Sequence, residues 1–139
     1  MKITFYKLQI KDTDDIYIGS TTNIDKRINT HRLKTKINYP LKLYKTINEA
    51  GGWSAVEKTI FGTIECVNNS IRYQKEQLLM DIFSATLNSK RAYVSPEMVK
   101  ALKYKPIQCQ CGTITSACNI SHHIKSKNHI KLLLQLATK

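Results

Sequence analysis

The feature that most constrains the fold is a pair of short runs near the N-terminus, rich in β-branched and aromatic side chains. ITFYKLQI covers residues 3–10, DIYIG covers residues 15–19, and the polar turn KDTDD joins them. Two such runs joined by a few polar residues predict a β-hairpin. Asn23 or Thr22 can cap a helix directly after it, over residues 24–34. The chain therefore begins with an antiparallel pair of strands and a helix.

The middle of the chain adds one strand and two helices. Pro40 suits the first turn of a helix, which the pair Gly51-Gly52 closes. A later alternating stretch predicts a strand, and Asn69 or Ser70 can cap the helix after it. We predict a helix over 41–50, a strand over 53–67 and a helix over 71–85. The resulting order, ββααβα, predicts an α+β domain.

The C-terminal third differs in composition and predicts a separate small module. Pro96 suits the start of a short helix, and Gly112 suits a tight turn or small hairpin after the first cysteines. A further helix is predicted from about Ala117 into the last residues. We therefore predict three parts: a domain over 1–91, a helical linker over 92–105 and a basic, metal-bound module over 106–139.

The net charge indicates the kind of partner. Lys and Arg number 22 against ten Asp and Glu, which gives a formal charge of +12, and residues 92–139 hold seven basic residues and one acidic residue. Such an excess favours a polyanion, and nucleic acid is the first candidate. No apolar run approaches the roughly 20 residues that cross a bilayer, and the N-terminus lacks an unbroken apolar segment. We expect a soluble, intracellular protein without a membrane partner.

Four side chains around the hairpin form a candidate site. Arg27 and His31 are four residues apart, so they share one face of the predicted helix. Tyr17 ends the second strand, Gly19 is expected to turn the chain sharply into the helix, and Tyr6 lies on the paired strand. A guanidinium can bind a phosphate with two hydrogen bonds and stabilise developing charge, so this set suits phosphodiester chemistry.

These residues resemble the signature of the GIY-YIG nuclease family, which includes phage homing endonucleases and the N-terminal domain of the UvrC repair nuclease. Tyr6, the run Tyr17-Ile18-Gly19, Ser20, Arg27 and His31 stand in the family's order. The resemblance covers residues 1–91 and implies a small three-stranded antiparallel sheet flanked by helices. It also implies two further site residues, Glu76 in RYQKEQLLM and Asn88 in ATLNSKRA. The first signature departs from the family pattern, because Thr4-Phe5-Tyr6 keeps the tyrosine and loses the glycine.

The resemblance further implies hydrolysis assisted by a single Mg²⁺ or Mn²⁺ held by Glu76. Arg27 would stabilise the transition state, and Tyr17 or Tyr6 would orient or deprotonate the attacking water. Tyr17 is preferred because it lies nearer to Arg27 in the sequence. His31 would relay a proton or contact phosphate, and Asn88 would support Glu76 or the ligand.

The C-terminal module carries a metal-binding pattern, CQCGTITSACNISHHIKSKNH. Three cysteines and three histidines compete for four places around a tetrahedral Zn²⁺. His122 and His123 are about 100° apart on a helix, so they cannot easily face one ion. We choose Cys109, Cys111, His123 and His129, and leave Cys118 packed or free. The segment also resembles the short Cys-x-Cys-Gly fingers beside GIY-YIG domains in large DNA viruses.

The leading interpretation is a divalent-metal-dependent DNA endonuclease with a zinc finger that aids DNA binding. The substrate would be double-stranded or branched DNA, bound by a monomer or a transient dimer. The alternatives are a catalytically inactive nucleic-acid-binding protein and an RNA-directed nuclease. The resemblance also suggests a viral or mobile-element protein that acts in the nucleus or cytoplasm of a host cell.

Overall fold

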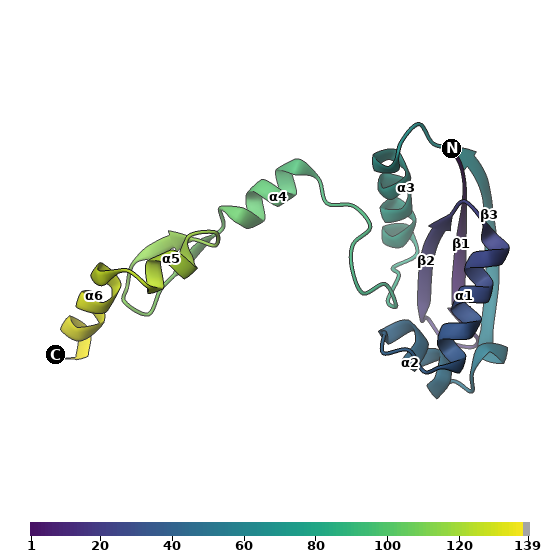
Figure 1. The fold of residues 1–139 in the computed structure, drawn as a ribbon, viewed down its shortest axis with the longest axis horizontal. Helices are drawn as coiled ribbons and strands as arrows, with labels where there is room; N and C mark the ends of the chain where they lie inside the picture. Colours follow the sequence, from purple (N-terminus) through teal and green to yellow (C-terminus); the bar gives the residue numbers. More distant parts are fainter. Residues whose placement is uncertain (138–139) are drawn as a thin grey trace. The chain divides into compact units, whose positions relative to one another are not determined.

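The computed structural model describes residues 1–137 and divides into two units, residues 1–93 and residues 94 onward. Residues 138 and 139 of the predicted C-terminal module lie outside the described residues. The elements of the first unit are β1 (Lys2–Ile10), β2 (Ile16–Thr21), α1 (Ile24–Lys36), α2 (Lys42–Glu49), the 3₁₀ turn η1 (Trp53–Ala55), β3 (Val56–Glu65) and α3 (Asn69–Ile82) (Figure 1). The order confirms the predicted α+β fold with a three-stranded antiparallel sheet flanked by helices.

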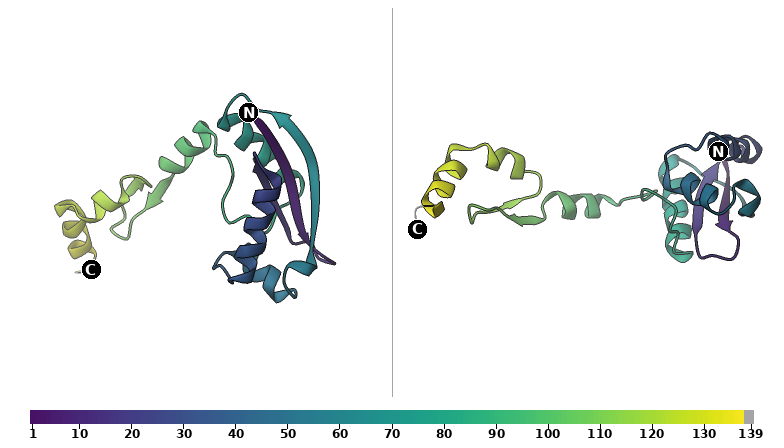
Figure 2. Two further views of the ribbon diagram at one scale, coloured as in Figure 1. Left: turned by 45° about the vertical axis from the view of Figure 1, so that its right-hand side comes forward. Right: turned by 90° about the horizontal axis from the view of Figure 1, so that it is seen from below.

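The sheet has the strand order β2-β1-β3, and both pairings are antiparallel. Side chains alternate between the two faces of a strand. One face of β1 therefore carries Tyr6 and Leu8, which pack with Ile28 of α1. The other face carries Ile3 and Phe5, which pack with residues of α3 and the segment before it. Helices α1 and α3 thus cover different faces of the sheet (Figure 2).

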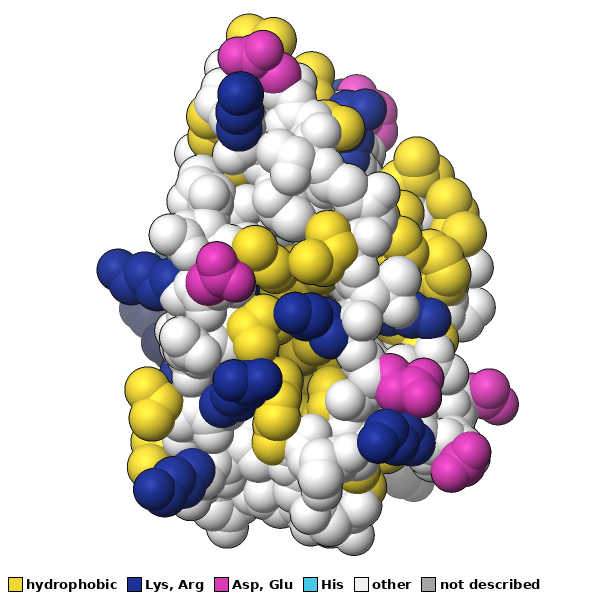
Figure 3. All heavy atoms as spheres, turned by 90° about the vertical axis from the view of Figure 1, so that its right-hand side faces the viewer, with side chains coloured by type: hydrophobic (Ala, Val, Ile, Leu, Met, Phe, Trp, Pro, Cys, Tyr) yellow, Lys and Arg dark blue, Asp and Glu magenta, His cyan; other side chains and the backbone are white. Residues whose placement is uncertain are grey.

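β3 is an edge strand, and nine of its ten residues are exposed. Figure 3 looks toward this side of the sheet, where apolar, basic and acidic side chains are interspersed over the surface. Among the exposed apolar side chains are Ile60, Phe61 and Ile64. A bulge lies in the pairing with β1, between Phe5 and Tyr6, and Gly62 beside it has a φ of 131°. This positive φ accounts for the glycine that interrupts the strand pattern.

Of two helix caps, one agrees with the sequence prediction and one differs from it. The cap of α1 is Asn23, whose side chain accepts a hydrogen bond from the Lys26 amide, as predicted. The cap of α3 is Asn68, one residue before the first predicted candidate, Asn69, and two before the second, Ser70. Both asparagines have extended backbone and accept a bond from an amide three residues later, which is the geometry of an N-cap.

The second unit contains α4 (Pro96–Lys103), the hairpin strands β4 (Pro106–Gln108) and β5 (Ile114–Ser116), α5 (Ile120–Ile124) and α6 (Lys127–Ala137). The predicted single helix from about Ala117 is wrong, because α5 and α6 are separate helices. The Ser126 hydroxyl donates to the His123 carbonyl and accepts a bond from the His129 amide, so it closes one helix and begins the next. Within residues 1–137, none of the helices has the length and apolar character to cross a bilayer.

Candidate active site

The pairing register of β1 and β2 brings two tyrosines to one face of the sheet. Tyr6 lies opposite Gly19, and Leu8 lies opposite Tyr17. Residues two apart on a strand share a face, so Tyr6 and Tyr17 are diagonal neighbours. Their ring centroids are 6.2 Å apart.

Gly19 has a different role from the turn that the sequence predicts. It lies within β2, and its φ is outside the left-handed region. A Cβ at this position would lie 2.5 Å from Tyr6 Oη and 2.9 Å from Tyr17 Cε1. The expected turn is therefore wrong: the glycine is needed because the phenol of Tyr6 lies directly against the strand.

Arg27 on α1 joins the two phenols. Its Nε donates to Tyr6 Oη at 2.9 Å, and its Nη2 donates to Tyr17 Oη at 3.2 Å. His31, one turn further along α1, is hydrogen-bonded through Nε2 to Tyr6 Oη at 2.8 Å. The structure therefore brings together four of the six catalytic candidates, namely Tyr6, Tyr17, Arg27 and His31, in one continuous network.

The four side chains differ in burial, and burial decides which of them can contact a substrate. Tyr6 is 0% exposed and His31 is 1% exposed, whereas Tyr17 and Arg27 are half-buried. Burial, with the neighbouring Tyr17, raises the pKa of Tyr6 well above its ordinary value. Burial and the positive charges of Arg27 and Lys34 lower the pKa of His31 to about 3. At neutral pH Tyr6 is thus protonated, His31 is a neutral imidazole, and both act on a substrate only through their neighbours.

The sequence analysis missed Tyr44, which completes the surroundings of His31. Tyr44 comes from α2, is 2% exposed, and its Oη lies 3.1 Å from His31 Nδ1. Both ring nitrogens of His31 are thus bonded to phenols, and the indole of Trp53 stacks near the ring at a centroid distance of 6.5 Å. Because each phenol can either donate or accept, the two hydrogen bonds hold the imidazole ring in place in either of its neutral tautomers.

Glu76 lies on the other side of β2. It projects from α3, and its Oε2 accepts a hydrogen bond from the Ser20 hydroxyl. Arg72, one turn earlier on α3, donates through Nε to Ser20 Oγ and through Nη2 to the Ser20 carbonyl, both at 2.7 Å. The sequence analysis also missed Arg72. The only signal that could have found it is its position four residues before the expected carboxylate.

Asn88, which was expected to support Glu76 or the ligand, is hydrogen-bonded to the backbone of β2. Its Oδ1 accepts from the Ile18 amide at 2.9 Å, and its Nδ2 donates to the Ile18 carbonyl at 2.8 Å. The side chain thus pairs with the free edge of β2, next to Tyr17. This pairing fixes the segment after α3 against the strand that carries the site.

The site residues on the two sides of β2 line one cleft of about 380 Å³. Its lining includes Tyr17, Arg27, Glu76, Asn88 and the basic pair Lys90-Arg91. Burial raises the pKa of Glu76, while the Ser20 hydroxyl and the positive charges of Arg72 and Arg27 oppose the rise. A phosphate in this cleft would meet a guanidinium and a phenol on one side and a carboxylate on the other.

The second unit brings together the four residues chosen as zinc ligands. The ligand atoms of Cys109, Cys111, His123 and His129 all lie within 4.8 Å of one another. Cys111 Sγ is 3.1 Å from His123 Nε2, and Cys109 Sγ is 3.5 Å from His129 Nδ1. Hydrogen bonds from Thr113, and further ones from the two histidines, lower the pKa of Cys111 to about 6. Cys118 is exposed and lies outside this group.

Comparison with known proteins identifies a family and a solved structure that this chain resembles. The family model of the GIY-YIG catalytic domain matches residues 2–88. A solved structure of a mutant of the catalytic domain of intron endonuclease I-TevI is similar in fold, with a TM-score of 0.57 and 18% sequence identity. The match covers 68% of this chain and 100% of that domain. No curated protein matches the chain in sequence.

The family match extends over more than half of the chain, so the protein belongs to the GIY-YIG family. It is a nuclease, an enzyme that hydrolyses phosphodiester bonds.

Proposed function

We propose that the chain is a divalent-metal-dependent DNA endonuclease whose C-terminal module binds zinc and adds affinity for DNA. The observation that carries the proposal is the shared cleft, in which Tyr17, Arg27 and Glu76 face the same space from both sides of β2. A DNA-binding surface without catalysis needs cations, but it gains nothing from a half-buried carboxylate among them.

The donors in the cleft fit a hard divalent ion. Glu76 offers a carboxylate of which only Oε2 accepts a hydrogen bond from residues 1–137, so Oε1 is available as a ligand. A site with one carboxylate suits Mg²⁺ or Mn²⁺, which keeps most of its waters and binds substrate phosphate. When bound, such an ion would stabilise charge on a phosphate oxygen and lower the pKa of a coordinated water.

Arg27 is placed to hold the scissile phosphate. Two of its N–H donors bind the phenols of Tyr6 and Tyr17, and an arginine has five, so three remain for phosphate oxygens. The bonds to the phenols fix the plane of the guanidinium before substrate binds. A donor group that is already oriented pays little reorganisation when charge develops on the phosphate.

Tyr17 is the phenol that can meet the attacking water. It lines the cleft, whereas Tyr6 is fully buried with a raised pKa. Arg27 donates to Tyr17 Oη, which leaves the hydroxyl hydrogen and one lone pair of that oxygen for a water. Tyr6, His31 and Tyr44 would then hold Arg27 and Tyr17 in place from behind.

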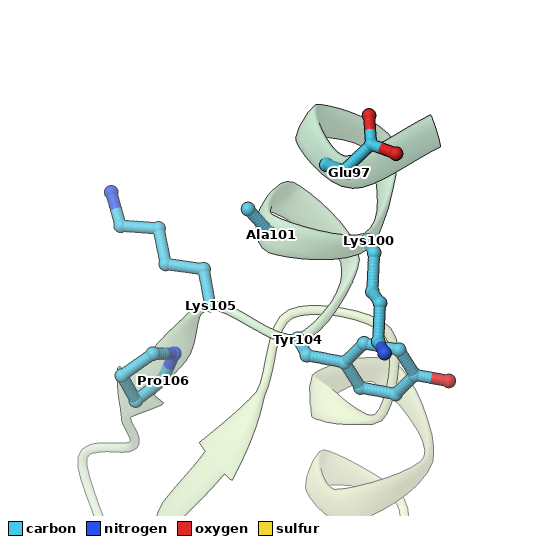
Figure 4. A pocket seen from close by; sticks show the side chains of 6 residues that line it. All are labelled: Glu97, Lys100, Ala101, Tyr104, Lys105 and Pro106. Carbon is cyan, nitrogen blue, oxygen red and sulfur yellow. The ribbon is translucent and has the colours of Figure 1, made fainter. Parts of the chain in front are cut away.

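The C-terminal module would contribute phosphate contacts. Two thiolates and two imidazoles suit tetrahedral Zn²⁺. Lys125, Lys127 and Lys131 are exposed on and between α5 and α6. Figure 4 shows an open pocket in this unit whose lining includes two more basic residues: Lys100 of α4, which lies beside the ring of Tyr104, and Lys105 of the segment before β4, which extends away from that ring. Contacts of this kind raise affinity for any sequence and make it salt-dependent.

The test is cleavage of supercoiled plasmid and of branched duplexes with Mg²⁺ or Mn²⁺, by the native chain and by Glu76→Gln. We expect metal-dependent nicking that falls at least about 10²-fold in the variant, the scale of losing a transition-state electrostatic group. Glu57→Gln on the exposed β3 is the matched control and should cut normally. Binding without cutting by the native chain would favour the non-catalytic alternative, and cutting of RNA alone would favour an RNA-directed nuclease.

A further inference from the structure

Arg72 and Ser20 form a fixed pair beside Glu76. The two guanidinium donors of Arg72 bind two atoms of one residue, Ser20 Oγ and Ser20 O, each at 2.7 Å. Ser20 is 7% exposed and belongs to β2, while Arg72 and Glu76 lie one turn apart on α3. The pair therefore ties the helix that carries the carboxylate to the strand that carries Tyr17.

The contacts determine which way the serine hydroxyl points. A hydroxyl has one hydrogen to donate, and a guanidinium can only donate. Because Arg72 Nε donates to Ser20 Oγ, the Ser20 hydrogen is free to go to Glu76 Oε2. The order of donation runs from Arg72 through Ser20 to Glu76. Oxygen Oε2 of the carboxylate accepts the serine hydrogen, and Oε1 has no hydrogen-bond partner among residues 1–137.

We propose that Arg72 is a positioning residue, which acts through Ser20 to hold the Glu76 carboxylate in the orientation that binds the divalent ion. The inference rests on the proposed role of Glu76 as the metal ligand. It assigns Arg72 to orientation of the carboxylate rather than to contact with DNA. Groups that hydrogen-bond a metal ligand from behind set its orientation and its affinity for the metal.

The fork geometry of Arg72 makes the inference testable. Lysine keeps the positive charge but lacks two fixed, parallel N–H donors, so it cannot bind Ser20 Oγ and Ser20 O in the same way. Arg72→Lys therefore separates orientation from charge. Lys75→Arg, an exposed exchange of the same two residue types on α3, is the matched control.

The first measurement is binding of Mn²⁺ to the zinc-saturated full chain, followed by the electron paramagnetic resonance signal of free Mn²⁺. We expect Arg72→Lys to weaken binding by about 10-fold, within the range for loss of such a supporting contact, and Ser20→Ala to do the same. The concentration of Mg²⁺ for half-maximal cleavage should rise by a similar factor, with a much smaller change in rate at saturating metal. DNA binding by the zinc-loaded chain without added Mg²⁺ or Mn²⁺ should stay within twofold of the native chain.

A double variant tests whether Arg72 acts through Ser20. We expect Arg72→Lys to weaken Mn²⁺ binding by less than about threefold when Ser20→Ala is already present, because contacts in one network are not additive. Full additivity, or unchanged Mn²⁺ affinity in folded Arg72→Lys, would overturn the inference. So would a loss of DNA binding by the zinc-loaded variant without added Mg²⁺ or Mn²⁺, which would identify Arg72 as a phosphate contact.

The outcome is separable from that of the proposed function. If Glu76→Gln binds Mn²⁺ as tightly as the native chain, the metal site itself is wrong and this inference falls with it. If Glu76→Gln loses Mn²⁺ while Arg72→Lys and Ser20→Ala keep it, only the role of Arg72 is wrong. Should Arg72→Lys fail to fold, Ser20→Ala alone decides, because it removes the hydroxyl on which the proposal depends.

Discussion

The two units of this protein bury different kinds of side chain. Residues 1–93 enclose three apolar clusters, with Ile3, Tyr6, Leu8 and Ile47 among their most buried members. In residues 94–137 the buried residues are Cys109, Cys111 and His129, all members of the Cys/His group. The first unit is held together by apolar packing, whereas the second gathers its buried surface around a metal-binding arrangement.

This difference indicates that the two units have different sources of stability. Burying apolar surface contributes roughly 25 cal/mol per Å², so the first unit has a source of stability that needs no ligand. A segment of fewer than about 50 residues with so little apolar burial needs a metal or another covalent or ionic link. Four predictions test this comparison, from the largest expected effect to the smallest.

Removal of zinc should unfold the second unit alone. Structural zinc contributes about 10 kcal/mol or more to folding of small modules. A strong chelator, or Cys109→Ser, should collapse the amide NMR dispersion of residues 94–137, while the fluorescence of Trp53 in the first unit stays unchanged. Cys118→Ser is the control and should keep the dispersion. A change in Trp53 fluorescence on removal of zinc would show that the first unit also depends on the metal, which would contradict the comparison.

Acid should destabilise the first unit through His31. Its pKa is about 3 in the folded protein and about 6.5 when unfolded, so protons bind the unfolded state first. The contribution of His31 is complete above pH 6.5 and is lost as the pH falls toward 3, up to roughly 5 kcal/mol. Urea unfolding followed by Trp53 should show this loss, and His31→Asn should flatten the profile between pH 6.5 and 4. An unchanged profile in the variant would show that His31 is not the group responsible.

Gly19→Ala should damage the first unit by crowding Tyr6. The new Cβ would lie 2.5 Å from Tyr6 Oη, a contact that requires the ring or the strand to move. Overpacking of this kind costs about 1–3 kcal/mol. Urea denaturation should show that loss, together with a fall in nuclease activity as the bonds of Arg27 are displaced. Native stability in this variant would mean that β2 shifts without cost.

Lys125→Gln should have the smallest effect and should act on DNA binding alone. Removal of one phosphate contact lowers the slope of log affinity against log salt by about 0.9. Fluorescence anisotropy over a range of salt concentrations measures this slope. Lys58→Gln on the exposed β3 is the matched control. Equal slopes for the native chain and both variants would argue that the module does not contact phosphate through Lys125.

The sequence by itself determined the order of elements and the set of reactive side chains. Runs rich in β-branched and aromatic residues predicted β1 and β2, and an alternating stretch predicted β3, because such side chains suit a pleated sheet. The four-residue spacing of Arg27 and His31 placed them on one helix face. These features are local, because they depend on residues close together in the chain, and the family resemblance added Glu76 and Asn88.

Only the tertiary structure decided how those side chains meet. Tyr44 and Arg72 became visible as parts of the site because α2 and α3 pack against residues far away in the sequence. Gly19 was expected to make a turn, and its true role depends on the ring of Tyr6 from the neighbouring strand. His123 and His129 are six residues apart and would point about 120° apart on one straight helix. The break at Ser126 brings His123 Nε2 and His129 Nδ1 to 3.3 Å, because it changes the direction of the chain between them.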